Sequence, residues 1–215
     1  MKAWVRSLWP EGRLLTGARL DVPEPVRARH RAPGQYLVLP GRDGRGLTLA
    51  LASVPGAAAL ELLLGPEAAE RAGLRVDEAL EIEGPSGPGF DLEAARGGDV
   101  LVFGTGSALS ALKPLLDLIA ADRQSFGQVR AYFGAVDEAA HAYRDQDPRW
   151  EAAGIRVRRS GARPWVQEVF LEDAEPLTPA QSYAFAAGLP VMLDGVKDAL
   201  RARGIPAERL GLNFG

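Results

Sequence analysis

The sequence predicts two folded halves, an N-terminal antiparallel β-barrel over residues 1–94 and a doubly wound α/β domain with a parallel sheet over residues 95–215. Two observations lead to this fold class. In the first half, short apolar segments are separated by Gly and Pro, which is typical of small antiparallel barrels and sandwiches. In the second half, strand-like and helix-like segments alternate, which favours a parallel sheet covered by helices.

The first half contains several segments with the composition of strands. The strands are expected at residues 18–22, 35–39, 47–52, 60–64 and 79–83. One helical insertion is expected between Pro66 and Ala72.

The second half opens with the stretch around which the chain is organised, a strand, a glycine turn and a helix. Apolar residues run up to Phe103, the turn Gly104-Thr105-Gly106 follows, and residues 107–119 have helical spacing. Further strands are expected at residues 128–134, 155–159 and 182–187, with helices at 137–144 and 191–203. Ligands of such a sheet bind at the carboxyl ends of its strands.

The glycine turn is a candidate phosphate site. A turn of this kind brings bare backbone N–H groups to the positive end of a helix, where a pyrophosphate can sit without meeting side chains. A glycine turn between a strand and a helix is also common as a purely structural device. Both interpretations stay open on this turn alone.

Composition excludes several classes of function. The formal net charge is -3, and Lys and Arg are spread along the chain, so nucleic acid is not an expected partner. Cysteine is absent, which excludes disulfides, thiolate metal sites and cysteine nucleophiles within this chain. No apolar run approaches the roughly 20 residues that a membrane helix needs, and the N-terminal residues lack a secretion signal. We therefore expect no membrane insertion and a cytoplasmic location.

Neither histidines nor tryptophans indicate a site. His30 and His141 are far apart in the sequence and lack metal-ligand spacing, so we expect packed or solvated side chains and no metal site. The four tryptophans are expected to be packing residues rather than rings that stack on a cofactor. They are Trp4, Trp9, Trp150 and Trp165.

Five short motifs occur in an order that resembles the ferredoxin-NADP reductase superfamily. They are Pro-Gly-Gln-Tyr at residues 33–36, Gly-Pro-Ser-Gly-Pro-Gly-Phe at 84–90, Gly-Thr-Gly-Ser-Ala at 104–108, Tyr-Phe-Gly-Ala at 132–135 followed by Tyr-Arg-Asp at 143–145, and Gly-Leu-Pro-Val-Met at 188–192. The resemblance covers nearly the whole chain. It implies a flavin-binding barrel before a nicotinamide-nucleotide domain, with FAD and NADH or NADPH as cofactors.

The activity that the resemblance implies is that of a flavin-dependent oxidoreductase. Hydride would pass from NAD(P)H to FAD, and electrons would pass onward to an unknown acceptor, for which a separate protein is one candidate. The cofactors supply this chemistry, so no catalytic acid or base is expected from the side chains.

The resemblance also implies which residues contact the cofactors. On the barrel side they are Tyr36, Ala50, Leu51, Ser53, Gly84 and Gly87. On the nucleotide side they are Gly104, Thr105, Gly106, Ser107, Gly134, Val136, Gly188, Leu189, Pro190 and Met192. Near the C-terminus, Phe214 is a candidate ring to cover the isoalloxazine.

The chain departs from the family pattern at three places. The flavin signature Arg-x-Tyr-Ser/Thr is replaced by residues 47–50, which read Leu-Thr-Leu-Ala. The glycine-rich loop that holds the pyrophosphate is replaced by residues 65–70, which include Glu67 and Glu70, and Ala187 replaces a Cys. These departures motivate an alternative, a flavin-less and non-catalytic nucleotide-binding or interaction module that retains the reductase fold.

The expected choice of nucleotide depends on the residues that follow the second and third parallel strands. Val136 is followed by Asp137 and Glu138, and acidic side chains favour a ribose hydroxyl over a 2′-phosphate, so the sequence favours NADH. Asp137 could instead cap the helix that it precedes. Arg158 and Arg159 could favour NADPH by reaching a 2′-phosphate.

Overall fold

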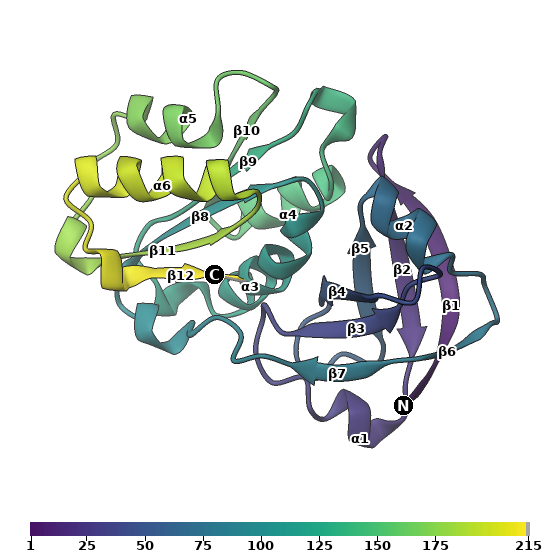
Figure 1. Ribbon diagram of the computed structural model, residues 1–215. Coiled ribbons are helices and arrows are strands. Elements are labelled where there is room, and N and C mark those ends of the chain that lie inside the picture. The colour runs from purple at the N-terminus through teal and green to yellow at the C-terminus, as the bar shows by residue number, and fades with distance from the viewer. Residues whose placement is uncertain (214–215) are drawn as a thin grey trace.

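The computed structural model describes residues 1–213 and has an antiparallel barrel beside an α/β domain, as Figure 1 shows. The barrel contains β1 (Lys2–Glu11), β2 (Leu15–Asp21), β3 (Tyr36–Pro40), β4 (Gly46–Ala50), β5 (Leu60–Leu64), β6 (Ala79–Glu81) and β7 (Glu83–Ser86), with α1 (Glu24–Arg27) and α2 (Pro66–Ala72). The strands form two sheets, in the orders β5-β2-β1-β6 and β4-β3-β7, and neighbouring strands are antiparallel. This arrangement confirms the predicted fold class of the first half.

The barrel strands confirm the five expected segments and add two strands, β1 and β7. The ten-residue strand β1 is absent from the sequence prediction because its alternation of apolar and polar residues is interrupted. Its pairing with β2 shifts register between Val5 and Ser7, and such a bulge puts successive residues out of the two-residue period.

The α/β domain contains a five-stranded parallel sheet with helices on both faces (Figure 1). Its strands are β8 (Asp99–Thr105), β9 (Val129–Gly134), β10 (Ile155–Ser160), β11 (Ser182–Ala187) and β12 (Leu210–Leu212), in the order β10-β9-β8-β11-β12. Helices α3 (Leu109–Ala121) and α4 (Asp147–Ala152) cover one face, and α5 (Val166–Glu172) and α6 (Pro190–Ala202) cover the other. The doubly wound fold predicted for this half is confirmed.

Short 3-10 helices connect these elements. They are Glu93–Ala95, Gly106–Ala108, Arg123–Ser125, Glu138–Ala140, Arg144–Gln146, Pro179–Gln181 and Ala207–Arg209. None of the described helices has both the length and the apolar character needed to cross a membrane.

The helix expected over residues 137–144 is wrong. The structure has a single 3-10 turn at Glu138–Ala140, and α4 begins only at Asp147. The four residues 140–143 are all buried, which a helix lying on the surface of a sheet cannot achieve with consecutive side chains. Tyr143 also takes a positive φ of 57°, so the backbone there is not helical. His141 lies in this buried connection and not on a helix.

The two halves share a hydrophobic core. Leu15, Ala50, Ala52, Leu63 and Phe90 of the first half belong to the same buried cluster as the residues of β8 and α3. A second cluster fills the barrel, and a third lies between the parallel sheet and helices α5 and α6. The shared cluster fixes the barrel against the end of the parallel sheet where the strands terminate.

Candidate functional site

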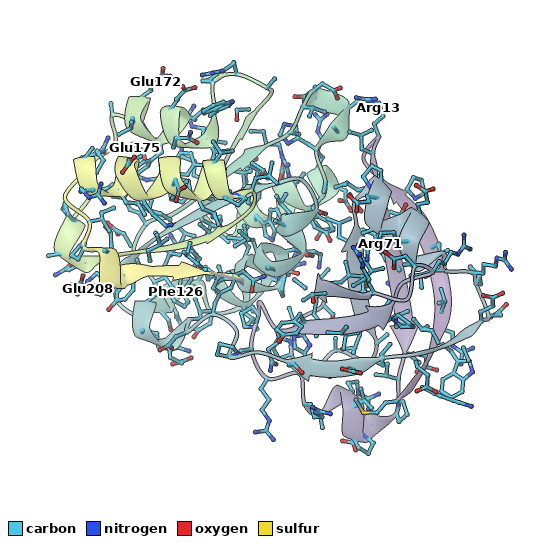
Figure 2. All side chains as sticks on the ribbon, viewed as in Figure 1. Arg13, Arg71, Phe126, Glu172, Glu175 and Glu208 are labelled. Carbon is cyan, nitrogen blue, oxygen red and sulfur yellow. The ribbon has the colours of Figure 1, made fainter. Side chains whose placement is uncertain are left out.

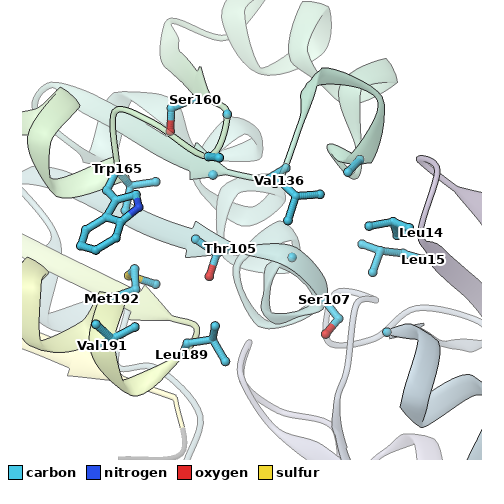
Figure 3. Close-up of a pocket in the computed structure, with 18 of the residues that line it drawn as sticks. Leu14, Leu15, Thr105, Ser107, Val136, Ser160, Trp165, Leu189, Val191 and Met192 are labelled. Atoms are coloured by element: carbon cyan, nitrogen blue, oxygen red, sulfur yellow. The ribbon is translucent and has the colours of Figure 1, made fainter.

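A cavity of about 590 Å³ lies where β8, β9 and β10 end, between the α/β domain and the barrel (Figure 3). Seven of the residues expected to contact a cofactor line it, namely Thr105, Gly106, Ser107, Gly134, Val136, Leu189 and Met192. The barrel contributes Leu14, Leu15, Gly65 and Pro66. The cavity is therefore at the carboxyl edge of the parallel sheet, where a doubly wound fold binds its ligands.

The glycine turn after β8 has the geometry of a ligand site. Gly106 has a φ of +57°, and an added Cβ atom would meet no atom within 4 Å, so its backbone faces open space. Gly104 has a different role, because a Cβ atom there would lie 2.5 Å from Leu112 Cδ1 of α3. Gly104 thus allows the helix to pack on the strand, and Gly106 and Ser107 face the cavity.

The loop between β11 and α6 approaches the same turn. A Cβ atom on Gly188 would lie 2.7 Å from Thr105 Oγ1 and 2.3 Å from Met192 Cε. Pro190 begins α6, where its missing N–H removes no helical hydrogen bond. The structure therefore brings together Thr105, Gly188 and Met192.

The electrostatic character of the cavity comes from helix ends. The described lining residues include no Lys, Arg, Asp or Glu. Residues at the N-terminal ends of α2, α5 and α6, and in the turn before α3, line the cavity. The N-terminal end of α3 carries a partial positive charge, so this part of the cavity favours an anion without cationic side chains, whereas the end of α2, with Pro66 and Glu67, does not.

The rim of the cavity is apolar. Among the described residues, nine large apolar side chains are exposed, and five of them line this cavity: Leu14, Val136, Trp165, Leu189 and Val191. Exposed apolar side chains gathered at one place mark a surface that is covered in function.

Trp165 corrects an expectation from the sequence. Its indole is 41% exposed and lines the cavity, whereas Trp150 is fully buried, as expected for a packing residue. The Arg163 guanidinium lies 4.0 Å from the centre of the Trp165 ring. Glu168 fixes this pair, since its carboxylate lies 3.0 Å from Arg163 and accepts the Trp165 backbone N–H at 2.6 Å. The sequence signal was the position of Trp165 after the third parallel strand, at the edge where ligands bind.

Asp137 acts as a cap, which is the second of the two roles considered from the sequence. Its carboxylate accepts the backbone N–H of Ala140 at 3.0 Å and forms an ion pair with Arg13 of the barrel. The hydrogen bond from Arg13 lowers the pKa of Asp137. The guanidinium of Arg159 is likewise occupied, because it forms an ion pair with Asp147 at 2.6 Å.

The barrel residues expected to contact a flavin fall into two groups. Tyr36, Gly84 and Gly87 lie together, since a Cβ atom on Gly87 would be 2.8 Å from Tyr36 Cε1 and one on Gly84 would be 2.7 Å from the Tyr36 carbonyl oxygen. The second group, Ala50, Leu51 and Ser53, is buried. Ser53 Oγ accepts the backbone N–H of Glu61 at 3.2 Å.

The C-terminal candidate, Phe214, lies outside the described residues. The last described residue, Asn213, lies beside the barrel, because a Cβ atom on Gly34 would be 3.2 Å from Asn213 Oδ1. The chain therefore returns to the barrel turn that precedes Tyr36.

Comparison with known proteins shows the fold. No family model matches the sequence. A curated protein, fruit protein pKIWI502 of Actinidia deliciosa, is 28% identical over 151 residues, which cover 64% of this chain and 47% of the relative. The chain thus spans about half the length of the curated relative that it matches.

Solved structures match over nearly the whole chain. Cytochrome P450 reductase GcoB of Amycolatopsis has a TM-score of 0.85 and 19% identity, with 99% of this chain and 69% of that chain covered. A ferredoxin NADP+ reductase of Neisseria gonorrhoeae has a TM-score of 0.82 and 17% identity, with coverages of 100% and 98%. The FAD/NAD-binding domain of a Vibrio cholerae nitric oxide dioxygenase has a TM-score of 0.80 and 15% identity, with coverages of 98% and 96%. The chain has the two-domain fold of these reductases.

Proposed function

We propose that this chain, which has the fold of ferredoxin-NADP reductases, is an oxidoreductase that transfers hydride from a nicotinamide nucleotide to a flavin. Electrons then pass to a further acceptor, for which a separate protein is a candidate. The observation that carries the proposal is the cavity at the carboxyl ends of β8, β9 and β10, with the barrel as one wall. The Neisseria gonorrhoeae reductase of the same fold is a structure with bound FAD and NADP.

The cavity residues suit the parts of a nicotinamide nucleotide. The open backbone at Gly106 and Ser107, at the entry to α3, would hold the diphosphate. The exposed Trp165 ring would stack on the adenine, and the Arg163 guanidinium beside it adds to the stacking surface. The loop that carries Gly188 and Met192 would then lie on the nicotinamide side.

We further propose that the site prefers NADH to NADPH. A 2′-phosphate needs a cation, and no cationic side chain is among the described lining residues. The nearby guanidinium groups of Arg13, Arg159 and Arg163 already form ion pairs with carboxylates. Arg158, the other arginine considered from the sequence, is exposed and does not line the cavity.

The barrel does not fit a tightly held flavin dinucleotide. Leu47 and Leu49, where the flavin signature would place Arg and Tyr, are only 6% and 9% exposed and belong to the barrel core. Helix α2 opens with Pro66, which has no N–H group, and Glu67, which repels a phosphate. We therefore derive no step through a resident FAD and propose a flavin that exchanges with solution. When bound, a flavin would supply the hydride acceptor, and the ring would lie on the barrel side, near Tyr36.

The first test is binding and turnover with defined ligands. NADH at about 100 times its dissociation constant should stabilise the protein by roughly 2.7 kcal/mol, which is a rise in Tm of roughly 5–10 °C for a chain of this size. Added FAD or FMN should then accelerate NADH oxidation, with one NADH and one proton consumed for each flavin reduced. Visible absorption before and after desalting would report whether flavin stays bound.

Two tryptophan variants provide a matched control. NADH should quench the fluorescence of the wild type and of Trp4→Phe, because Trp4 lies on β1 and not in the cavity, and the quenching should be lost in Trp165→Phe. A rise in Tm with no flavin-dependent oxidation would contradict the redox proposal and favour the flavin-less module. If neither NADH nor NADPH raises the Tm, the proposal of a nucleotide site is contradicted.

A further inference from the structure

The tip of the β1–β2 hairpin crosses from the barrel to the α/β domain. Figure 2 shows Arg13 at this tip, beside the α/β domain. The Arg13 backbone N–H donates to the carbonyl oxygen of Ala139 at 2.7 Å. Gly12 has a φ of +60°, and a Cβ atom there would lie 2.8 Å from the His141 carbonyl oxygen. The hairpin tip therefore touches the loop after β9, backbone against backbone.

Two charged side chains strengthen this contact. The Arg13 guanidinium lies 2.5 Å from Asp137 Oδ2, and both side chains are about half exposed. The Glu11 carboxylate accepts the backbone N–H of Tyr143 at 2.7 Å and the indole N–H of Trp9 at 3.1 Å. Each charged group of the tip thus has a partner in the loop formed by residues 137–143.

The same tip supplies a wall of the cavity. Leu14 and Leu15 follow Arg13 directly and line the cavity, as does Val136 (Figure 3). Ala140, in the loop formed by residues 137–143, also lines it. Leu15 is also buried in the core that the two halves share. The width of the cavity at this point therefore depends on how closely the hairpin tip is held to the loop.

We propose that Arg13 and Glu11 are positioning residues, which hold the hairpin tip against residues 137–143 so that Leu14 and Leu15 close one side of the nucleotide cavity. The inference rests on the proposed function for the identity of the ligand. It assigns Asp137 to a clamp between the two halves rather than to the ribose of the nucleotide.

A double-mutant cycle distinguishes these two roles of Asp137. Asp137→Asn keeps an oxygen that can cap Ala140 but loses the ion pair, and Arg13→Ala loses the same ion pair from the other side. Each change should raise the Kd for NADH about two- to fivefold, the range expected from an exposed ion pair, and kcat should be unchanged. The double variant should bind NADH as well as the weaker single variant. If Asp137→Asn raises the Kd for NADH and Arg13→Ala does not, the clamp is overturned and a contact between Asp137 and the ribose is favoured.

A matched control lies on β1 and β2, the two strands of the hairpin. Arg6 and Asp21 form an ion pair at 2.8 Å that is as exposed as the pair of Arg13 and Asp137, but neither residue is among those that line the cavity. Arg6→Ala should leave the Kd for NADH at the value of the wild type. An equal rise in Arg6→Ala would show a general effect of charge and overturn the proposal.

A second measurement does not depend on the ligand. Hydrogen exchange without nucleotide should become faster in Arg13→Ala over residues 9–15 and over residues 137–144, with no change in Arg6→Ala. Unchanged exchange in both segments would overturn the clamp. If the wild type binds no nicotinamide nucleotide, the proposed function fails, and this exchange measurement still decides whether the clamp exists.

Discussion

His30 is a buried side chain with a pH-dependent cost. Its side chain is 4% exposed, and neither ring nitrogen has a hydrogen-bond partner among the described residues. Burial disfavours the charged imidazolium and lowers the pKa of His30 from 6.5 to about 4. Between these two values the unfolded chain binds a proton that the folded chain does not.

We predict that acid destabilises the fold through His30. The free energy of unfolding should fall as the pH falls from 6.5 to about 4, with His30 contributing up to about 1.4 kcal/mol per pH unit. Urea unfolding across this range should show a flatter dependence on pH for His30→Leu, because the leucine side chain does not titrate. Parallel curves of unfolding free energy against pH for the two proteins would contradict this assignment. The pH dependence that remains in His30→Leu should include a contribution from His141, because burial also lowers the pKa of that residue.

The residues of the site differ in how far the sequence could predict them. Thr105, Gly106 and Ser107 follow a buried strand and open a helix, so their place at the sheet edge follows from local pattern alone. Trp165 could not be predicted in the same way, because an aromatic residue in a loop is most often a packing residue. The role of Asp137 depends on Arg13, which is 124 residues away in the sequence, and no local pattern indicates that contact.

At the scale of elements, the loop between β11 and α6 depends on close packing at Gly188. We predict that Gly188→Ala destabilises the fold by about 1–3 kcal/mol, because the new Cβ atom would overlap Met192 Cε and Thr105 Oγ1. Chemical denaturation measures the change, and the Kd for NADH should rise as the loop moves. Gly161→Ala is the control, since a Cβ atom at that position meets nothing within 4 Å. Equal stability of the two variants would contradict the prediction.

Elements with an unbroken apolar run or a clear helical period could be predicted from the sequence, whereas the long strand β1 and the short elements β12 and α4 could not. Strands β8, β9 and β11 and helices α3 and α6 carry runs of apolar residues or a clear helical period. Strand β12 has three residues and α4 has six, which is too short for a period to appear. These short elements are stabilised by packing against the rest of the sheet and its hydrophobic core.

At the scale of the whole molecule, the shared core makes the two halves one folding unit. The fold class follows from the change in pattern near residue 94, but the shared core leaves no periodic signal in the sequence. We predict a single cooperative transition for the whole chain in calorimetry. A fragment of residues 95–215 should melt at a lower temperature, because it exposes the face of α3 that Ala52 and Leu63 cover. Two separate transitions in the whole chain would contradict this prediction.

The hairpin tip that forms a wall of the cavity also affects how such a protein can evolve. Most of the cavity lining comes from the second half, and the wall of Leu14 and Leu15 comes from the first. A mutation in the barrel can therefore alter ligand preference while every residue of the nucleotide domain stays the same. A recombinant that combines this α/β domain with the barrel of a distant homologue would lack the cavity wall formed by Leu14 and Leu15. The two halves are therefore expected to have evolved together.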